Sequence, residues 1–328
     1  MTKLNSLICP NDNPNLTEER IKATFDTNHL AAIFHGGYEK VKRRREIVNY
    51  VKQHPELHDS LPVEFMSREE RFENINRKLL PWMKHMKNAV DINNPEEMKY
   101  FENLVMGTDG HPLGIHFIMG IPAILNNADD EQLKQWLPKV MNNEYVLAYA
   151  QTELGHGTNL KNLETTAIFD SKTQEFVLNS PTITSTKWWP GNLGKSSNWS
   201  IVMAQLIIGK KNYGPHPFFV QIRDSETHEP LPRLSVGDIG PKFELNSNDN
   251  GFLRFDNFRI PRTSLMMKHA KVLPDGTYVP AIHPKLGYLT MIVVRAAVVT
   301  VASEYLSKAC VIATRYSAIR RQGEIIPG

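Results

Sequence analysis

The sequence predicts an α+β protein in which helices come first, strands follow, and helices return. Residues 1 to about 145 carry helix start and stop signals, and from 146 to 280 short alternating apolar runs lie between turn residues. After residue 284 a long apolar run begins. Segregated helices and strands are typical of α+β proteins, and several short strands favour a small barrel or sandwich. We therefore expect a helical domain at 1–145, a β domain at 146–280, and the first helices of a C-terminal bundle at 281–328.

The first 145 residues should form short amphipathic helices at 18–25 and 28–34, a longer basic helix at 38–53, and further helices after it. Residues that usually begin or end helices occur at Gly36, Ser67 with Glu70, Asn94 with Pro95, Asp129, and Asn142. The segment 115–125 is nearly all apolar, so we expect it inside the helical bundle.

The middle of the chain changes to a strand pattern. Runs at 164–169 and 175–178 flank a polar turn and predict a hairpin, and further strands are expected at 145–148, 182–189, 200–208 and 217–223. The alternating run at 251–261 slips phase at Asp256 and Asn257, which suggests a β-bulge.

The run 286–302 is apolar apart from two threonines and Arg295. A membrane span needs about 20 apolar residues, and a central arginine is costly in lipid. A buried bundle helix is the better interpretation. A buried arginine needs an anion, which is either a carboxylate of the protein or part of a bound ligand, and the sequence leaves both open.

The composition is ordinary for a globular protein and excludes few functions. The 328 residues are 41% hydrophobic and 22% charged, and the formal charge is 38 − 35 = +3, which mildly favours an anionic ligand. The basic run 43–45 lacks stacking aromatics, so a solvated helix face or a partner contact is favoured over nucleic acid. We find no hydrolytic motif, no phosphate-binding Walker loop and no metal-ligand spacing, and two distant cysteines suit a reducing compartment.

A polar loop with two glycines follows the apolar run 145–148. Gly155 and Gly157 let the backbone approach a ligand, and Gln151, Thr152 and Thr158 add hydrogen-bonding side chains. Such a loop suits a flat heterocycle or a phosphate. An ordinary polar turn between strands is the alternative.

Trp188 and Trp189 stand before a Pro-Gly turn that ends at Gly191. Neighbouring residues of a strand face opposite sides, so one tryptophan can be core while the other is half exposed or covers something. An aromatic plate beside a glycine turn fits a planar ring system, and a tryptophan lid on a barrel end is the alternative.

Five stretches together resemble the peroxisomal acyl-CoA oxidases, flavin enzymes related to the acyl-CoA dehydrogenases. They are Ala-Gln-Thr-Glu-Leu-Gly-His-Gly-Thr-Asn at 150–159, Asn-Leu-Glu-Thr-Thr-Ala at 162–167, Lys-Trp-Trp-Pro-Gly at 187–191, Val-Gly-Asp-Ile-Gly-Pro-Lys at 236–242 and Arg-Tyr-Ser-Ala at 315–318. The resemblance implies an acyl-CoA dehydrogenase-like fold, bound FAD, a peroxisomal location, and a homodimer or a heterodimer with a related oxidase.

The resemblance also implies the reaction and the residues that serve it. An acyl-CoA oxidase converts acyl-CoA and molecular oxygen into trans-2-enoyl-CoA and hydrogen peroxide. By matching motif, the flavin contacts are Tyr149, Ala150, Gln151, Thr152, Gly157, Thr158, Gly191, Arg315 and Ser317. The acyl-CoA contacts are Lys285, Leu286, Gly287, Tyr288 and Arg295. For Arg315, a surface ion pair on a helix is an equal alternative.

No residue of the chain matches the family's catalytic base. Neither Glu153 nor Glu164 is taken as the base. Glu153 lies in the flavin-loop motif, where orienting the loop is the better role, and His156 between two glycines is structural or touches ligand. The family's catalytic glutamate belongs to a segment later than Gly328. We therefore expect little turnover from these residues alone. The alternative function is a non-catalytic paralogue that binds FAD or acyl-CoA and partners a full-length oxidase.

Overall fold

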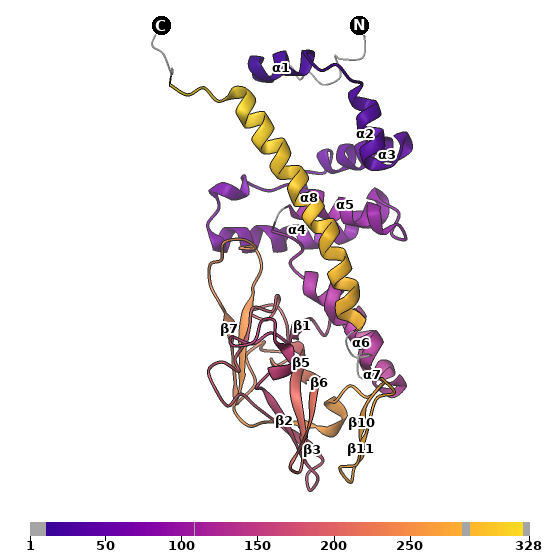
Figure 1. Ribbon diagram of the computed structural model, residues 1–328, viewed down its shortest axis with the longest axis vertical. Helices are drawn as coiled ribbons and strands as arrows, with labels where there is room; N and C mark the ends of the chain where they lie inside the picture. Colours follow the sequence, from indigo (N-terminus) through magenta and orange to yellow (C-terminus); the bar gives the residue numbers. More distant parts are fainter. Residues whose placement is uncertain (1–10, 108, 284–288, 324–328) are drawn as a thin grey trace. The chain divides into compact units, whose positions relative to one another are not determined.

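The computed structural model describes residues 11–107, 109–283 and 289–323. The chain divides into two compact units, one made of residues 1–50 with 295–328 and the other of residues 51–294 (Figure 1). The division into three domains at 145 and 280 stays a prediction.

The first unit is helical. It contains α1 (Pro14–Ile21), α2 (Thr27–His35), most of α3 (Tyr38–Lys52) and most of α8 (Leu289–Ile319). Asn13 and Asp26 accept backbone N–H bonds at the starts of α1 and α2, which places the first helix earlier than predicted. Gly36, with φ of 80°, ends α2 in the left-handed conformation that the sequence predicted.

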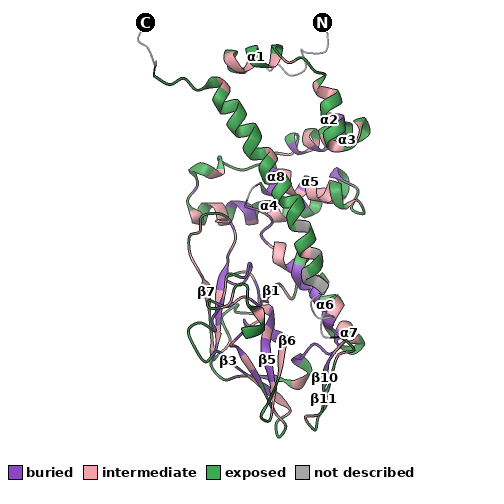
Figure 2. Ribbon diagram, viewed as in Figure 1, coloured by how far each residue is buried: buried purple, intermediate pink, exposed green. Residues whose placement is uncertain are grey.

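Helix α8 is exposed along the part whose side chains are described (Figure 2). The prediction of a buried helix is therefore wrong here, and the side chain of Arg295 is also exposed. By length and composition alone, Val294–Ile319 could cross a membrane, and none of that window is buried. Apolar composition does not bury a helix unless another surface packs on it. The absence of a membrane span stays a prediction.

The described helices that lie wholly within the second unit are α4 (Arg68–Ala89), α5 (Pro95–Met106), a π-turn at His116–Gly120, α6 (Ile121–Asn127) and α7 (Asp130–Met141). Short 3-10 turns occur at Pro55–Leu57, Val63–Phe65, Leu160–Asn162 and Arg262–Ser264. The predicted caps are confirmed: Ser67 and Glu70 form a capping box, as do Asp129 and Gln132, and Asn94 caps α5. The segment 115–125 is only partly buried. It exposes Phe117, Ile118 and Leu125, so the prediction of a wholly internal segment is wrong.

The strands form three sheets. The largest runs in the order β1 (Leu147–Ala150), β5 (Trp199–Ile208), β2 (Thr166–Asp170), β3 (Glu175–Asn179) and β9 (Phe258–Pro261), with β6 (Lys211–Gln221) also paired to β5. A second sheet contains β4 (Lys187–Trp188), β8 (Gly251–Phe255) and β7 (Leu234–Asp238), and a third contains β10 (Lys271–Val272) and β11 (Tyr278–Val279). β1 and β2 both pair with β5 in parallel, and β2 with β3 forms the predicted antiparallel hairpin.

Two strand predictions need correction. Only Lys187–Trp188 of the expected strand 182–189 is extended, because Thr182 and Ser185 bond to each other's backbone N–H and form a turn. Asp256 and Asn257 are not a bulge. They connect β8 of one sheet with β9 of another, and Asn257 has φ of 48°, as a tight connection requires.

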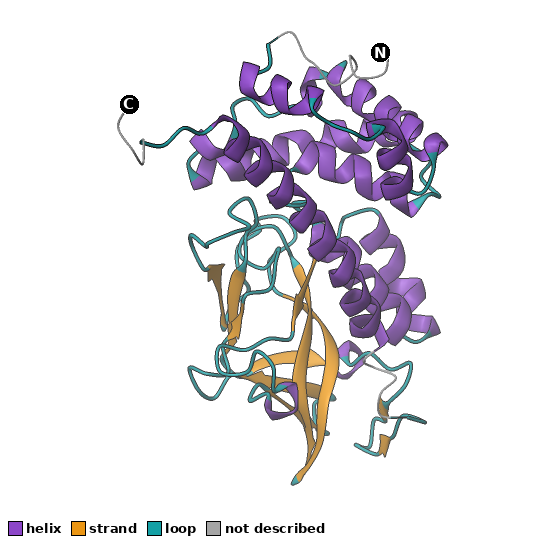
Figure 3. Cartoon of the chain, turned by 45° about the horizontal axis from the view of Figure 1, so that its top comes forward, coloured by secondary structure: helices purple, strands orange, loops and turns teal. Residues whose placement is uncertain are grey.

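The two larger sheets share one core. Leu253 and Phe255 of β8 pack with Val202, Ala204 and other buried residues of the large sheet, which gives the expected sandwich-like arrangement. A second core lies between the large sheet and the helices beside it (Figure 3). In it, α6 and α7 pack against β1, β5 and β6 through residues that include Trp136, Leu147 and Phe219. These helices pack against the start of β5 and against β1, from whose end the polar loop leaves.

Candidate functional site

The polar loop that follows β1 pairs with the segment that precedes the Pro-Gly turn. The N–H of Trp188 donates to the carbonyl of Thr152 at 3.0 Å, and the N–H of Leu154 donates to the carbonyl of Thr186 at 2.8 Å. The N–H of Gly155 then donates to the carbonyl of Thr184 at 2.9 Å. Thr152 therefore lies beside Trp188, which precedes Gly191 by three residues.

Close packing explains two of the three glycines. A Cβ on Gly155 would come within 2.8 Å of the Cβ of Thr184, and a Cβ on Gly191 within 2.8 Å of Cγ1 of Ile115. A Cβ on Gly157 would meet nothing within 4 Å. Gly155 and Gly191 thus leave room for the side chains of Thr184 and Ile115, whereas the space that a Cβ at Gly157 would enter is open.

The two tryptophans have different environments. Trp188 is half-buried and stacks on Phe252 with ring centroids 6.3 Å apart. Trp189 has φ of 90° and is 48% exposed, and its N–H donates to the carbonyl of Gly251 at 3.0 Å. A bulky residue rarely adopts a positive φ, and such strain gathers at functional sites. The turn therefore presents a partly exposed indole two residues before Gly191.

A buried ion pair lies beneath the loop. Nζ of Lys187 is 3.0 Å from Oε1 of Glu153, and both side chains have no exposed surface. Burial lowers the pKa of Lys187 to about 8, while the charge of Glu153 opposes that shift. Lys187 was not among the residues assigned to the site from the sequence. In the sequence it is a lysine between Thr186 and a tryptophan in an extended stretch, and such a lysine can be either buried or exposed.

The second carboxylate of the region, Glu164, is also occupied by hydrogen bonds. It accepts from the hydroxyls of Thr182 and Thr184 and from Nε2 of His156, which is 3.2 Å from its Oε1. These bonds, the threonines first, lower the pKa of Glu164. Both glutamates therefore bond to the loop or to the segments beside it, and the orienting role expected for Glu153 stays a prediction.

Comparison with known proteins identifies the family. The family model for the acyl-coenzyme A oxidase N-terminal domain matches residues 26–146, and that for the acyl-CoA oxidase C-alpha1 domain matches residues 288–327. Acyl-coenzyme A oxidase acox-1.1 of Caenorhabditis elegans is 51% identical over 99% of this chain and 48% of its own length. Peroxisomal acyl-coenzyme A oxidase 1 of Cavia porcellus is 48% identical over 96% of this chain and 48% of its own.

A solved structure agrees with the sequence matches. Acyl-CoA oxidase-2 of Caenorhabditis elegans, bound with FAD, ascaroside-CoA and ATP, superposes with a TM-score of 0.87 at 48% identity, over 98% of this chain and 49% of that chain. The chain belongs to the acyl-CoA oxidase family. The resemblance and the acyl-CoA dehydrogenase-like fold are confirmed, and the chain spans about half the length of the oxidases it matches.

The other residues assigned by resemblance to the oxidase site lie in several places. Tyr149 and Ala150 end β1, with Ala150 fully buried, and Gln151 is buried while Thr158 is exposed. The assignment 285–288 lies outside the described residues. Their roles, and that of Arg295, stay predictions.

Arg315 and Ser317 lie on α8 in the first unit, and both are exposed. The hydroxyl of Ser317 donates to the carbonyl of Ala313 at 2.8 Å. Ser317 also lines a pocket of about 830 Å³ that includes Arg20, Lys22 and Arg321 of the same unit. Contact of Arg315 and Ser317 with a flavin stays a prediction.

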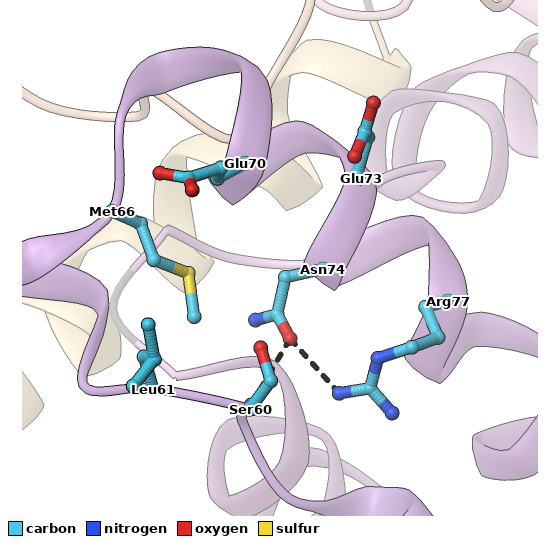
Figure 4. Close-up of a pocket in the computed structure, with 7 residues that line it drawn as sticks. All are labelled: Ser60, Leu61, Met66, Glu70, Glu73, Asn74 and Arg77. Atoms are coloured by element: carbon cyan, nitrogen blue, oxygen red, sulfur yellow. Dashed lines mark hydrogen bonds between the residues drawn. The ribbon is translucent and has the colours of Figure 1, made fainter.

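A smaller pocket of about 290 Å³ lies among the helices of the second unit (Figure 4). Arg77 lines this pocket. Its guanidinium donates to the carbonyl of His58 at 2.6 Å and to Oδ1 of Asn74 at 2.9 Å. Glu70 belongs to the capping box of α4. These polar groups serve the fold, and none of the proposed flavin contacts lines this pocket.

Proposed function

We propose that this chain supplies the flavin-binding part of a peroxisomal, FAD-dependent acyl-CoA oxidase. The observation that carries the proposal is the hydrogen bond from Trp188 N–H to the carbonyl of Thr152, which joins the polar loop to the segment that leads into the turn at Gly191. Family membership supplies the chemistry, and this junction supplies a place where one planar ring could contact both segments.

The residues present fit a flavin. The indole of Trp189 is partly exposed beside the turn, and the direction of a Cβ at Gly157 is open. A tricyclic ring needs apolar surface for its face and donors along its polar edge. Thr152, Gly157, Thr158 and Gly191 would hold the ring, and FAD supplies the acceptor for a hydride from the substrate.

The reaction proposed is the oxidation of acyl-CoA by O2 to trans-2-enoyl-CoA and hydrogen peroxide. In it the protein must fix the flavin edge and keep the Cα–Cβ bond of the substrate against the ring. Neither Glu153 nor Glu164 is assigned as the base, because each already accepts several hydrogen bonds within the loop. Acyl-CoA, O2 and a second oxidase subunit are the proposed partners. The peroxisome is the proposed location, which the names of the mammalian relatives support.

Titration of the purified chain with FAD tests the proposal. We expect saturable quenching of flavin fluorescence by the wild type. Gly157→Val places a side chain in open space above the loop, so it should leave the melting temperature unchanged and weaken FAD binding about tenfold, equivalent to about 1.4 kcal/mol.

Gly323→Val is a matched control, because a Cβ at Gly323 also meets nothing within 4 Å and the residue lies outside the loop. It should change neither quantity. Absence of saturable FAD binding by the wild type would overturn the proposed function. Wild-type affinity of Gly157→Val would instead show that the flavin does not lie over this loop.

A further inference from the structure

The buried pair of Lys187 and Glu153 is fully satisfied by hydrogen bonds. Nζ of Lys187 donates to Oε1 of Glu153 at 3.0 Å, to the carbonyl of Met203 at 2.6 Å and to the carbonyl of Gln151 at 3.2 Å. An ammonium group has three protons, so all of them are used. The lysine therefore ties β4 and β5 to the first peptide of the polar loop.

Glu153 anchors the same loop from the other side. Its Oε1 accepts from the N–H of Thr165 at 2.9 Å and from its hydroxyl at 2.6 Å, and its Oε2 accepts from the N–H of Glu164 at 2.8 Å. The carboxylate thus holds the segment that leads into β2 as well as Lys187. Four stretches of chain converge on one ion pair.

The direction of the Gln151 carbonyl determines the direction of the next N–H. The described backbone contains no cis peptide bond, and in a planar trans peptide the C=O and N–H point to opposite sides. Because the carbonyl of Gln151 points to the buried Nζ of Lys187, the N–H of Thr152 points away from that lysine. The carbonyl of Thr152 is held in turn by the N–H of Trp188.

We propose that Lys187, oriented by Glu153, is a positioning residue that fixes the Gln151–Thr152 peptide so that the N–H of Thr152 faces the polar edge of the flavin. This inference rests on the proposed function, since FAD is the ligand that the aligned N–H would meet. A preset donor binds its ligand without the entropy cost of ordering the loop.

The effects of removing one charge or both charges on stability distinguish a positioning role of Lys187 from a purely stabilising one. A buried ion pair contributes little net stability, and replacing both charges by neutral side chains of similar size is often harmless, whereas removing one partner leaves a buried unpaired charge. Stability should therefore return when both charges are removed. The orientation of the Gln151 carbonyl should not be restored, because Nζ of Lys187, which donates to it, is missing from the single and the double variant alike.

Three variants of the full chain test this separation. Lys187→Met removes the donor, and Lys187→Met with Glu153→Gln removes both charges. Lys78→Met is the matched control, because Lys78 is equally buried and bonded to Asp59 and the carbonyl of Val105, outside the loop. Each is measured for melting temperature and for FAD affinity by flavin fluorescence.

We expect the single Lys187 variant to lose both stability and FAD affinity, and the double variant to regain melting temperature while binding FAD about tenfold more weakly, the effect of one lost hydrogen bond. Lys78→Met should lose stability and keep its FAD affinity. Wild-type affinity in the double variant, or an equal loss of affinity in Lys78→Met, would overturn the inference.

Hydrogen–deuterium exchange without FAD provides an independent readout. Peptides covering residues 149–158 should exchange about tenfold faster in the double variant than in the wild type, while peptides from β6 should not change. Unchanged exchange in the loop would refute positioning even if the wild type binds FAD. If the wild type binds no FAD but the loop exchange rises as expected, the proposed function fails while the bracing of the loop stands.

Discussion

Two buried histidines should make the larger unit sensitive to mild acid. His111 is 6% exposed and its Nδ1 accepts the N–H of Leu113 at 3.0 Å, while His116 is fully buried and its Nδ1 accepts the N–H of Leu147 at 3.1 Å. A ring nitrogen that accepts carries no proton, so both rings are neutral with the proton on Nε2. Protonation of either ring would break its bond and charge a group packed edge-on against Phe117.

The size of the expected loss of stability follows from the pKa shifts of the two histidines. Burial lowers the pKa of each histidine from 6.5 to about 4, a difference of 6.5 − 4 = 2.5. At about 1.4 kcal/mol for each unit, each histidine contributes between about 3 and 4 kcal/mol and the pair roughly 7. A typical domain has a free energy of unfolding of about 5–15 kcal/mol, so this loss is large enough to unfold the unit.

The direction of the pH dependence is set by the difference between the numbers of protons bound by the unfolded and the folded chain. Between pH 6.5 and pH 4 the unfolded chain binds protons that the folded chain does not, so stability falls as the pH falls. The contribution of the histidines is complete above pH 6.5 and is lost progressively on the way to pH 4. Carboxylates with lowered pKa values, such as Asp170, also reduce the stability of the protein when they are protonated in acid, but they do so equally in a matched variant.

Urea unfolding from pH 7.5 to 4.5, followed by tryptophan fluorescence, measures this loss. All five tryptophans lie within residues 51–294, so the signal reports the unit that contains both histidines. Relative to wild type, the His111→Gln and His116→Gln double variant should lose less stability as the pH falls. His29→Gln, at an exposed position, should not change the slope. Equal slopes for wild type and double variant would refute the reasoning.

Two further changes should affect stability through local geometry, both measured as shifts of the urea midpoint. Gly251→Ala would place a Cβ 2.4 Å from the backbone nitrogen of Gly194, and because backbone cannot move aside as a side chain does, we expect a loss of about 3 kcal/mol; a loss below about 1 would contradict this contact. Ser67→Ala removes the side-chain acceptor for the N–H of Glu70 in the capping box of α4, so stability should fall by about 1 kcal/mol, and an unchanged midpoint would count against the cap.

The sequence alone determined the features that depend on neighbours along the chain. The caps at Ser67, Asn94 and Asp129 were predicted correctly because a capping side chain reaches only the next turn of its own helix. The hairpin of β2 and β3 was predicted for the same reason, since its turn and alternation are local. The motifs at 150–159 and 187–191 likewise identified the family before any contact was known.

Only the tertiary structure decided what distant segments do to one another. The phase slip at Asp256 and Asn257 proved to be a change of sheet, and the apolar α8 proved to be exposed, because both outcomes depend on which surfaces are available to pack. Lys187 could not be distinguished from a surface lysine until β4 was placed beside the loop and Glu153 was found within 3.0 Å. A charge far from water needs a partner, and that partner lies 34 residues away in the chain.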